Sequence, residues 1–145
     1  MKVIDSSSLS KYVNREPNHK SVADELLLRS AGGHGCVSLE LALTEVGNSI
    51  WKRVLRREIT REAASTVFHE FAQAVLRDGL VSLLPMDVEL LKDSFRLALS
   101  EKITIYDSVF IELGHREERG LVTSDEKQHD IFKRLYPKIG LVYIE

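Results

Sequence analysis

Four acidic residues, far apart in the sequence, follow short apolar runs or lie near the starts of predicted helices. Asp5 follows Val-Ile and Asp125 follows Leu-Val-Thr-Ser, whereas Glu45 and Asp107 fall inside helical patterns. Carboxylates brought close together repel one another, and a hard divalent cation relieves that repulsion. Oxygen ligands, with no histidine or cysteine at ligand spacing, favour Mg²⁺ or Mn²⁺ over Zn²⁺. The four acids therefore predict a site for one or two such cations.

The chemistry expected of this site is hydrolysis of a phosphodiester. A cation held by a few carboxylates keeps water molecules, one of which can attack phosphorus, and a second cation can stabilise the leaving oxygen. We therefore predict a metal-dependent nuclease. Its predicted metal-binding and catalytic residues are Asp5, Glu45, Asp107 and Asp125.

Each acid also has an ordinary structural explanation. Asp5 and Asp125 suit helix N-caps or turns, and Asp107 suits the positive end of a helix dipole. Glu45 is harder to explain in this way, because its neighbours in the predicted helix are mostly apolar. Burying a carboxylate there costs free energy unless a cation offsets it. On physical grounds Glu45 is the strongest of the four candidates, and Asp125 is the least secure.

The elements that must position these acids are short apolar strands alternating with helices. We expect strands near residues 2–4, 36–38, 80–84, 121–123 and 141–144. We expect the better-defined helices near residues 20–30, 39–57, 105–117 and 126–135. The helix at 20–30 is the second along the chain, and Gly32, Gly33 and Gly35 are expected to end it. This alternation predicts an α/β fold with three layers, a central parallel sheet flanked by helices. Right-handed crossovers then bring the four acids to one crevice at the carboxyl ends of the strands.

Polar residues before several helices are predicted to cap them. Ser38 is the expected N-cap of the helix at 39–57, and Thr60 and Asp87 are expected to cap the next two helices. In the helix after Asp87, the residues expected to face the core are Leu90, Leu91, Phe95 and Ala98.

Composition narrows the class of protein. The 145 residues correspond to a single domain, 1–145, and 43% hydrophobic residues are enough to bury a core. Cys36 is the only cysteine, which excludes an internal disulfide and a thiolate zinc cluster and favours the cytoplasm. No signal peptide and no apolar run of about 18 residues is found, so no membrane association is expected. A net charge of −2 leaves a nucleic-acid partner open.

A basic run follows Glu45 and contains Lys52, Arg53, Arg56, Arg57 and Arg61. Its cations, in particular Lys52, Arg53 and Arg56, either contact RNA phosphates or solvate the end of a helix, where positive charge is favourable. Asn48 lies one turn beyond Glu45 on the same helix face. It either hydrogen-bonds a metal ligand or the substrate, or is an ordinary polar surface residue.

The segments around the four acids resemble PIN-domain ribonucleases, specifically the VapC toxins of bacterial and archaeal toxin–antitoxin pairs. These segments are residues 3–7, 43–52, 104–111 and 121–125. No segment is specific by itself, but their order and spacing fit over essentially the whole chain. The resemblance implies a PIN fold and endonuclease cleavage of RNA with Mg²⁺ or Mn²⁺.

The resemblance also assigns roles to individual residues. The family's metal-binding acids match Asp5, Glu45, Asp107 and the more variable Asp125. Ser7 and Thr123 match hydroxyl positions that hydrogen-bond the carboxylates. The implied protein partners are a second copy of the chain, forming a homodimer, and an antitoxin that occludes the site.

Three alternatives stay open beside the toxin. One is a PIN-like scaffold that binds RNA or protein without cutting it, and another is a housekeeping RNA-processing nuclease. The third, a phosphoacceptor receiver domain, needs paired acids after the first strand and a lysine after the last. Here serines follow Asp5 and Lys138 precedes the last predicted strand, which disfavours a receiver.

Overall fold

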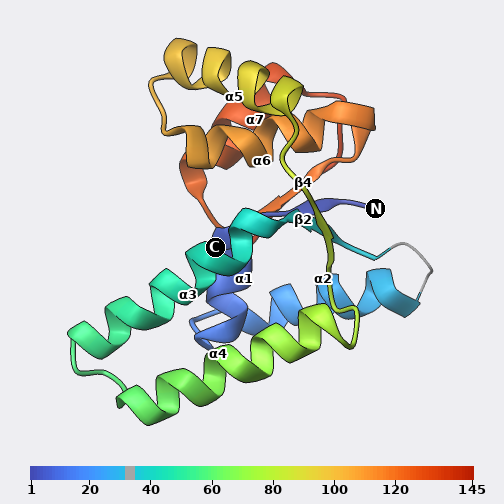
Figure 1. The fold of residues 1–145 in the computed structure, drawn as a ribbon. Coiled ribbons are helices and arrows are strands. Elements are labelled where there is room, and N and C mark those ends of the chain that lie inside the picture. The colour runs from blue at the N-terminus through green and yellow to red at the C-terminus, as the bar shows by residue number, and fades with distance from the viewer. Residues whose placement is uncertain (32–34) are drawn as a thin grey trace.

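The computed structural model describes residues 1–31 and 35–145, within which the chain forms a five-stranded sheet (Figure 1). The strands are β1 (Val3–Ile4), β2 (Val37–Leu39), β3 (Ser82–Leu84), β4 (Leu121–Thr123) and β5 (Leu141–Tyr143). They lie in the order β3-β2-β1-β4-β5, and every pair is parallel. All five match the predicted strands to within two residues. Gly32 and Gly33, expected to end the second helix, lie outside the described residues.

Helices cover both faces of the sheet. They are α1 (Ser6–Val13), α2 (His19–Ala31), α3 (Glu40–Leu55), α4 (Arg61–Leu76), α5 (Val88–Glu101), α6 (Ile105–His115), a 3₁₀ turn at Arg116–Glu118, and α7 (Glu126–Leu135). Figure 1 shows α1 to α4 on one side of the sheet and α5 to α7 on the other. The three-layer α/β architecture is therefore confirmed.

The sheet is apolar because helices bury it from both sides. Val3, Ile4, Leu121 and Val122, in the two central strands, are completely buried. Phe110 of α6 is also completely buried, and burying a side chain of this size contributes roughly 2–3 kcal/mol. The core thus fixes β1 and β4 side by side, which sets the positions of the residues that follow them.

Two local predictions were wrong. Leu91 and Phe95 of α5 were expected in the core, but they are 37% and 55% exposed, because the buried face turns toward Ser94 and Leu97 instead. Ser38 was expected to cap α3. It lies in β2, where its buried hydroxyl donates to the carbonyl oxygen of Ile4 at 2.7 Å.

The caps at Thr60 and Asp87 are confirmed. The Thr60 hydroxyl accepts the backbone N–H of Ala63 at 3.1 Å, and the Asp87 carboxylate accepts that of Leu90 at 2.7 Å. Each side chain satisfies a donor that the first helical turn leaves without a partner.

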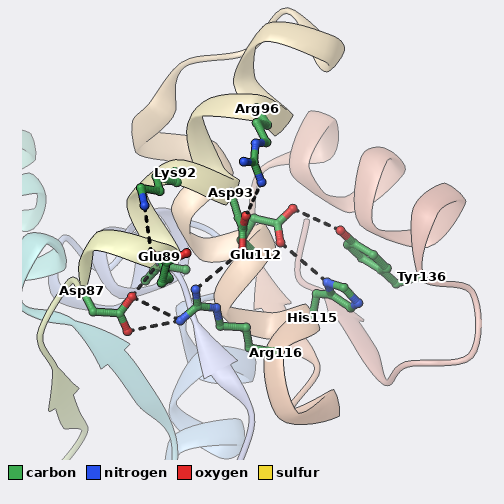
Figure 2. Close-up of polar contacts among 10 residues, drawn as sticks. Asp87, Glu89, Lys92, Asp93, Arg96, Glu112, His115, Arg116 and Tyr136 are labelled. Atoms are coloured by element: carbon green, nitrogen blue, oxygen red, sulfur yellow. Dashed lines mark hydrogen bonds and ion pairs between the residues drawn. The ribbon is translucent and has the colours of Figure 1, made fainter.

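A polar cluster surrounds the C-terminal end of α6 (Figure 2). We call it the α6 C-terminal network, and its members are Asp87, Asp93, Glu112, His115, Arg116 and Tyr136. Arg116 bonds both carboxylate oxygens of Asp87, at 3.1 and 3.3 Å, and lies 3.7 Å from Asp93. This guanidinium therefore ties the end of α6 to the start of α5.

Glu112, which is nearly buried, is the second centre of this network. It accepts the hydroxyl of Tyr136 at 3.1 Å and lies 3.6 Å from Nδ1 of His115. The rings of His115 and Tyr136 stack with centroids 4.0 Å apart. Burial and the neighbouring Glu112 charge raise the pKa of Tyr136, so its hydroxyl stays protonated and remains a donor.

No helix in the described part of the chain is both long enough and apolar enough to cross a membrane.

Candidate active site

Asp5 leaves the sheet at the end of β1 and caps α1. It is completely buried, and its Oδ1 accepts the backbone N–H of Ser8 at 2.9 Å. Its Oδ2 accepts two hydroxyls, that of Ser7 at 2.7 Å and that of Thr123 at 2.6 Å. Burial raises the pKa of Asp5, and these hydrogen bonds oppose the rise.

Thr123, the last residue of β4, links Asp5 to Asp125. Besides donating to Asp5, its hydroxyl accepts the backbone N–H of Asp125 at 3.0 Å. The Asp125 carboxylate then caps α7 by accepting the N–H of Gln128 at 2.8 Å. Ser7 and Thr123, whose hydroxyls were expected to hydrogen-bond the carboxylates, therefore both donate to Asp5.

Asp107 projects from the first turn of α6. The N-cap of this helix is Thr104, whose hydroxyl accepts the Asp107 backbone N–H at 3.2 Å and donates to Asp107 Oδ2 at 2.8 Å. The other carboxylate oxygen accepts the side-chain amide of Gln128 at 3.3 Å. Asp107 is thus held in place from its own helix and from α7.

Glu45 approaches from α3, on the other side of the sheet. Its Oε1 is buried and has no hydrogen-bond partner. Burial raises the pKa of Glu45, a hydrogen bond with Ser6 opposes the rise, and repulsion from Asp107 and Asp5 adds to it. The sequence argument was that a carboxylate at Glu45 needs an explanation. The structure agrees, because the surroundings of Glu45 disfavour the ionised form of its side chain.

One hollow collects these side chains at the carboxyl end of the sheet. We call it the acid pocket, and it is lined by Ser6, Ser7, Ser10, Glu45, Asn48, Ser49, Lys52, Asp107, Asp125 and Gln128. Asp5 is completely buried and is not a lining residue, but it accepts a hydrogen bond from Ser7, which is one. Asp125, the least secure candidate, is a lining residue together with Glu45 and Asp107.

The acids of the pocket have no ion-pair partner in the described part of the chain, although Lys52 lines the same hollow. Within residues 1–31 and 35–145, none of the ion pairs involves Asp5, Glu45, Asp107 or Asp125. Such a concentration of unpaired carboxylates is unfavourable for folding. An oxygen-binding cation would remove that penalty.

The pocket fits a hard divalent cation by its chemistry, although its side chains are not closed around one point. Among the described residues, no three acidic, histidine or cysteine side chains form a ready coordination group. The side-chain atoms of the pocket that could bind a metal ion are nevertheless oxygens of carboxylates, hydroxyls and amides. Two buried oxygens there, Oε1 of Glu45 and Oε1 of Gln128, have no partner. Small side-chain movements would therefore be needed to complete a site.

A second hollow continues the acid pocket along α3 and is more basic. It is lined by Asn14, Glu16, Ser49, Lys52, Arg53, Arg56 and Glu58, and it shares Ser49 and Lys52 with the acid pocket. Arg53 donates to Asn14 Oδ1 at 3.1 Å and to Glu58 at 3.3 Å. Arg56 lies 3.9 Å from the same glutamate.

Sequence reasoning missed four lining residues of the pocket, which are Ser6, Ser10, Ser49 and Gln128. Gln128 is the one that contacts a predicted metal-binding acid from another helix. It is 3% exposed and contacts Asp107. The available signal was its position three residues after Asp125, which is the spacing of a capping box.

Comparison with known proteins identifies the fold family. A family model described as PIN domain matches residues 2–134. Ribonuclease VapC3 of Pyrobaculum aerophilum is 28% identical over 134 residues, covering 92% of this chain and 95% of that protein. The crystal structure of PAE2754 from Pyrobaculum aerophilum superposes with a TM-score of 0.71 at 19% identity, over 99% of this chain and 83% of that one. Since the family model spans most of its length, this chain belongs to the PIN domain family.

Proposed function

We propose that this chain is a metal-dependent endoribonuclease and the toxin of a VapBC-type toxin–antitoxin pair. The observation that carries the proposal is the acid pocket, where Glu45 of α3, Asp107 of α6 and Asp125 before α7 line one hollow without an ion-pair partner among the described residues. Ser7, another lining residue, donates a hydrogen bond to the buried carboxylate of Asp5. Similarity to a VapC ribonuclease over 92% of the chain supports RNA as the substrate. The single cysteine, Cys36, suits action in the cytoplasm.

In this proposal Asp5, Glu45, Asp107 and Asp125 hold Mg²⁺ or Mn²⁺. Such a cation, when bound, supplies Lewis acidity at the phosphate and promotes ionisation of water. Ser7 and Thr123 keep Asp5 oriented by donating to its Oδ2. Burial raises the pKa of Glu45, and a bound cation would favour the ionised form of this carboxylate.

The basic hollow beside the acid pocket indicates the path that an RNA strand would follow away from the acids. Lys52 and Ser49 line both hollows, so a strand whose scissile phosphate lies among the acids can continue along Lys52 and Arg53. The bonds from Arg53 to Asn14 and Glu58 hold its guanidinium in place. We assign Lys52, Arg53 and Arg56 to phosphate contacts and Asn48, a lining residue, to a hydrogen bond with the substrate.

The protein partners in this proposal are an antitoxin and a second copy of the chain. Exposed apolar side chains support both. A groove between α3 and α4 is lined by Ile50, Trp51, Leu55 and Phe68, and concave apolar surfaces accept a helix or an extended segment. We assign it to the antitoxin. A stripe on α5, formed by Val88, Leu91, Phe95 and Leu99, is suited to packing against its own copy about a two-fold axis.

The direct test is cleavage of RNA by the purified chain with Mg²⁺ or Mn²⁺, with and without a chelator. We expect cleavage that needs the cation and is lost in Asp107→Asn. Cleavage that persists in this variant would refute the site assignment. Binding of RNA without cation and without turnover would instead favour a non-catalytic scaffold. Growth arrest on expression, relieved by the product of a neighbouring small gene, distinguishes a toxin from a housekeeping nuclease.

A further inference from the structure

The side-chain amide of Gln128 lines the acid pocket, and its nitrogen and oxygen differ in their hydrogen bonding. Its nitrogen Nε2 donates to Asp107 Oδ1 at 3.3 Å. Its oxygen Oε1 is buried and has no hydrogen-bond partner, although the residue is only 3% exposed. A buried acceptor without a donor costs free energy, so this oxygen calls for an explanation.

The local sequence predicts a different arrangement. In a capping box, a glutamine three residues after the N-cap reaches back to the backbone N–H of that cap. Asp125 is the N-cap of α7 and Gln128 stands at that position. The Asp125 N–H donates to the Thr123 hydroxyl instead, at 3.0 Å, so Gln128 is not needed there. Gln128 therefore does not complete the capping box that the local sequence predicts, and its side chain lines the acid pocket instead.

The orientation of the amide is fixed by its neighbour. If the amide were reversed, Oε1 would face the Asp107 carboxylate, and two acceptors would oppose each other. The contact with Asp107 therefore directs the oxygen away from that carboxylate.

Buried oxygens without partners are concentrated in this pocket. Among the described residues they are Oε1 of Glu45, Oε1 of Gln128 and the hydroxyl oxygen of Ser94. Glu45 and Gln128 both line the acid pocket, whereas Ser94 lies in α5 outside it. Two residues that line one hollow thus each carry a buried acceptor that is bonded to no donor, which fits a bound cation and its water.

We propose that Gln128 is a positioning residue of the acid pocket with two functions. Its amide nitrogen holds the Asp107 carboxylate, and its Oε1 is a neutral oxygen ligand for the divalent cation, directly or through one water. This inference rests on the proposed function, in which the pocket binds Mg²⁺ or Mn²⁺. A neutral ligand adds an oxygen without adding repulsion to a site already crowded with negative charge.

The test is Mn²⁺ binding by the full chain, followed by the electron paramagnetic resonance signal of unbound Mn²⁺. We expect Gln128→Leu to bind Mn²⁺ about 10-fold more weakly, the scale at which a supporting residue affects metal affinity. Gln128→Glu keeps an oxygen at the same place and should bind Mn²⁺ at least as tightly as the original chain. Ser94→Ala removes an oxygen without a partner outside the pocket and is the matched control, expected to bind Mn²⁺ normally.

Thermal unfolding without cation gives a second readout that is independent of cleavage. With a chelator present, Gln128→Glu should unfold at a lower temperature than the original chain, because a negative charge is added beside Asp107. Saturating Mn²⁺ should remove this difference. A residue that only packs in the structure would lower the unfolding temperature equally with and without Mn²⁺.

The outcomes separate the inference from the proposed function. Gln128→Leu binding Mn²⁺ with unchanged affinity would overturn the inference while leaving the metal site intact. Failure of the original chain to bind Mn²⁺ would overturn both. Should Gln128→Leu not fold, Gln128→Glu decides, since weaker Mn²⁺ binding by that variant contradicts an oxygen ligand at this position.

Discussion

The two ends of α6 carry carboxylates in opposite circumstances. At the N-terminal end, burial raises the pKa of Glu45, and the charges of Asp107 and Asp5 add to the rise. At the C-terminal end, Glu112 meets the Tyr136 hydroxyl and His115, while Arg116 bonds Asp87 (Figure 2). The same helix therefore passes from acids that are held by hydroxyl, amide and backbone donors to a network in which a guanidinium pairs with two of the acids.

This difference separates a structural role from a functional one. A polar cluster that serves only to join elements is expected to satisfy its own charges, because unsatisfied ones destabilise the fold. The α6 C-terminal network does so. The acid pocket does not, and a carboxylate with a raised pKa and a buried oxygen without a partner are typical of functional sites. The comparison favours function at the N-terminal end of α6.

The largest contrast is expected in RNA cleavage by the two glutamate variants. Glu45→Gln should lower cleavage by at least about 100-fold, since even partners that only orient metal ligands affect activity about 10- to 100-fold. Glu112→Gln, at the other end of the site's supporting helix, should leave cleavage unchanged and lower the unfolding temperature. Rates measured with Mn²⁺ on one RNA substrate check both. Equal losses in the two variants would remove the functional distinction between the two clusters.

A smaller effect is expected at Thr123, whose hydroxyl joins two of the acids. Thr123→Val keeps the shape but removes the donor to Asp5 and the acceptor for the Asp125 N–H. We expect Mn²⁺ affinity to fall by about 10-fold and stability by roughly 1–3 kcal/mol. Titration calorimetry and urea unfolding measure the two changes. Thr123→Ser retains the hydroxyl and should restore most of both; a serine variant as impaired as the valine one would refute the hydroxyl's role.

The sequence was sufficient for the parts of this molecule that follow local rules. The strands β4 and β1 were found because they are short apolar runs ended by an acid, and the caps at Thr60 and Asp87 because capping is local chemistry. The buried face of α5 was predicted only in part, because Leu90 and Ala98 are buried as expected whereas Leu91 and Phe95 are exposed. Its apolar residues surround most of the helix, so the buried face is decided by packing against α6, which the sequence does not display.

The site shows the same division between local and long-range information. Asp5, Glu45 and Asp107 stand out by type and position, and the electrostatic coupling of Glu45 to the other two agrees with a shared site. The ordinary explanations also hold, since Asp5 and Asp125 do cap helices. Gln128 was missed because its contact crosses from α7 to α6. A capping-box glutamine offers no sign that it will leave its own helix.

The α6 C-terminal network should respond to loss of its central cation. Arg116→Met leaves the carboxylates of Asp87 and Asp93 without this partner, so the urea midpoint should fall. Arg96→Met is the matched control, because Arg96 is 78% exposed and, in the described part of the chain, pairs only with Asp93; exposed pairs contribute little. Added salt should reduce the difference between the two variants. If Arg116→Met is as stable as Arg96→Met, the network does not hold α5 to α6.

The smallest effects, and the most specific, are opposite pH dependences of stability at the two clusters. Without cation, the raised pKa of Glu45 means that the unfolded chain loses this proton near 4.5, before the folded chain does. Stability therefore falls as pH rises from there through the folded value, and Glu45→Gln should gain relative to the original chain over that interval. Glu45 is half-buried and screened by solvent, so the gain is about 1 kcal/mol or less.

At Asp87 the sign is reversed. The backbone N–H of Leu90 and the charge of Arg116 lower its pKa below 3.8, so its contribution is complete above that value and is lost as pH falls through the folded pKa. Asp87→Asn should thus be less stable at neutral pH and converge with the original chain in acid. Urea midpoints at several pH values, all in chelator, test both variants together. Curves that run parallel to the original chain for Glu45→Gln would mean that the acid pocket carries no charge penalty, and the contrast between the two ends of α6 would lose its physical basis.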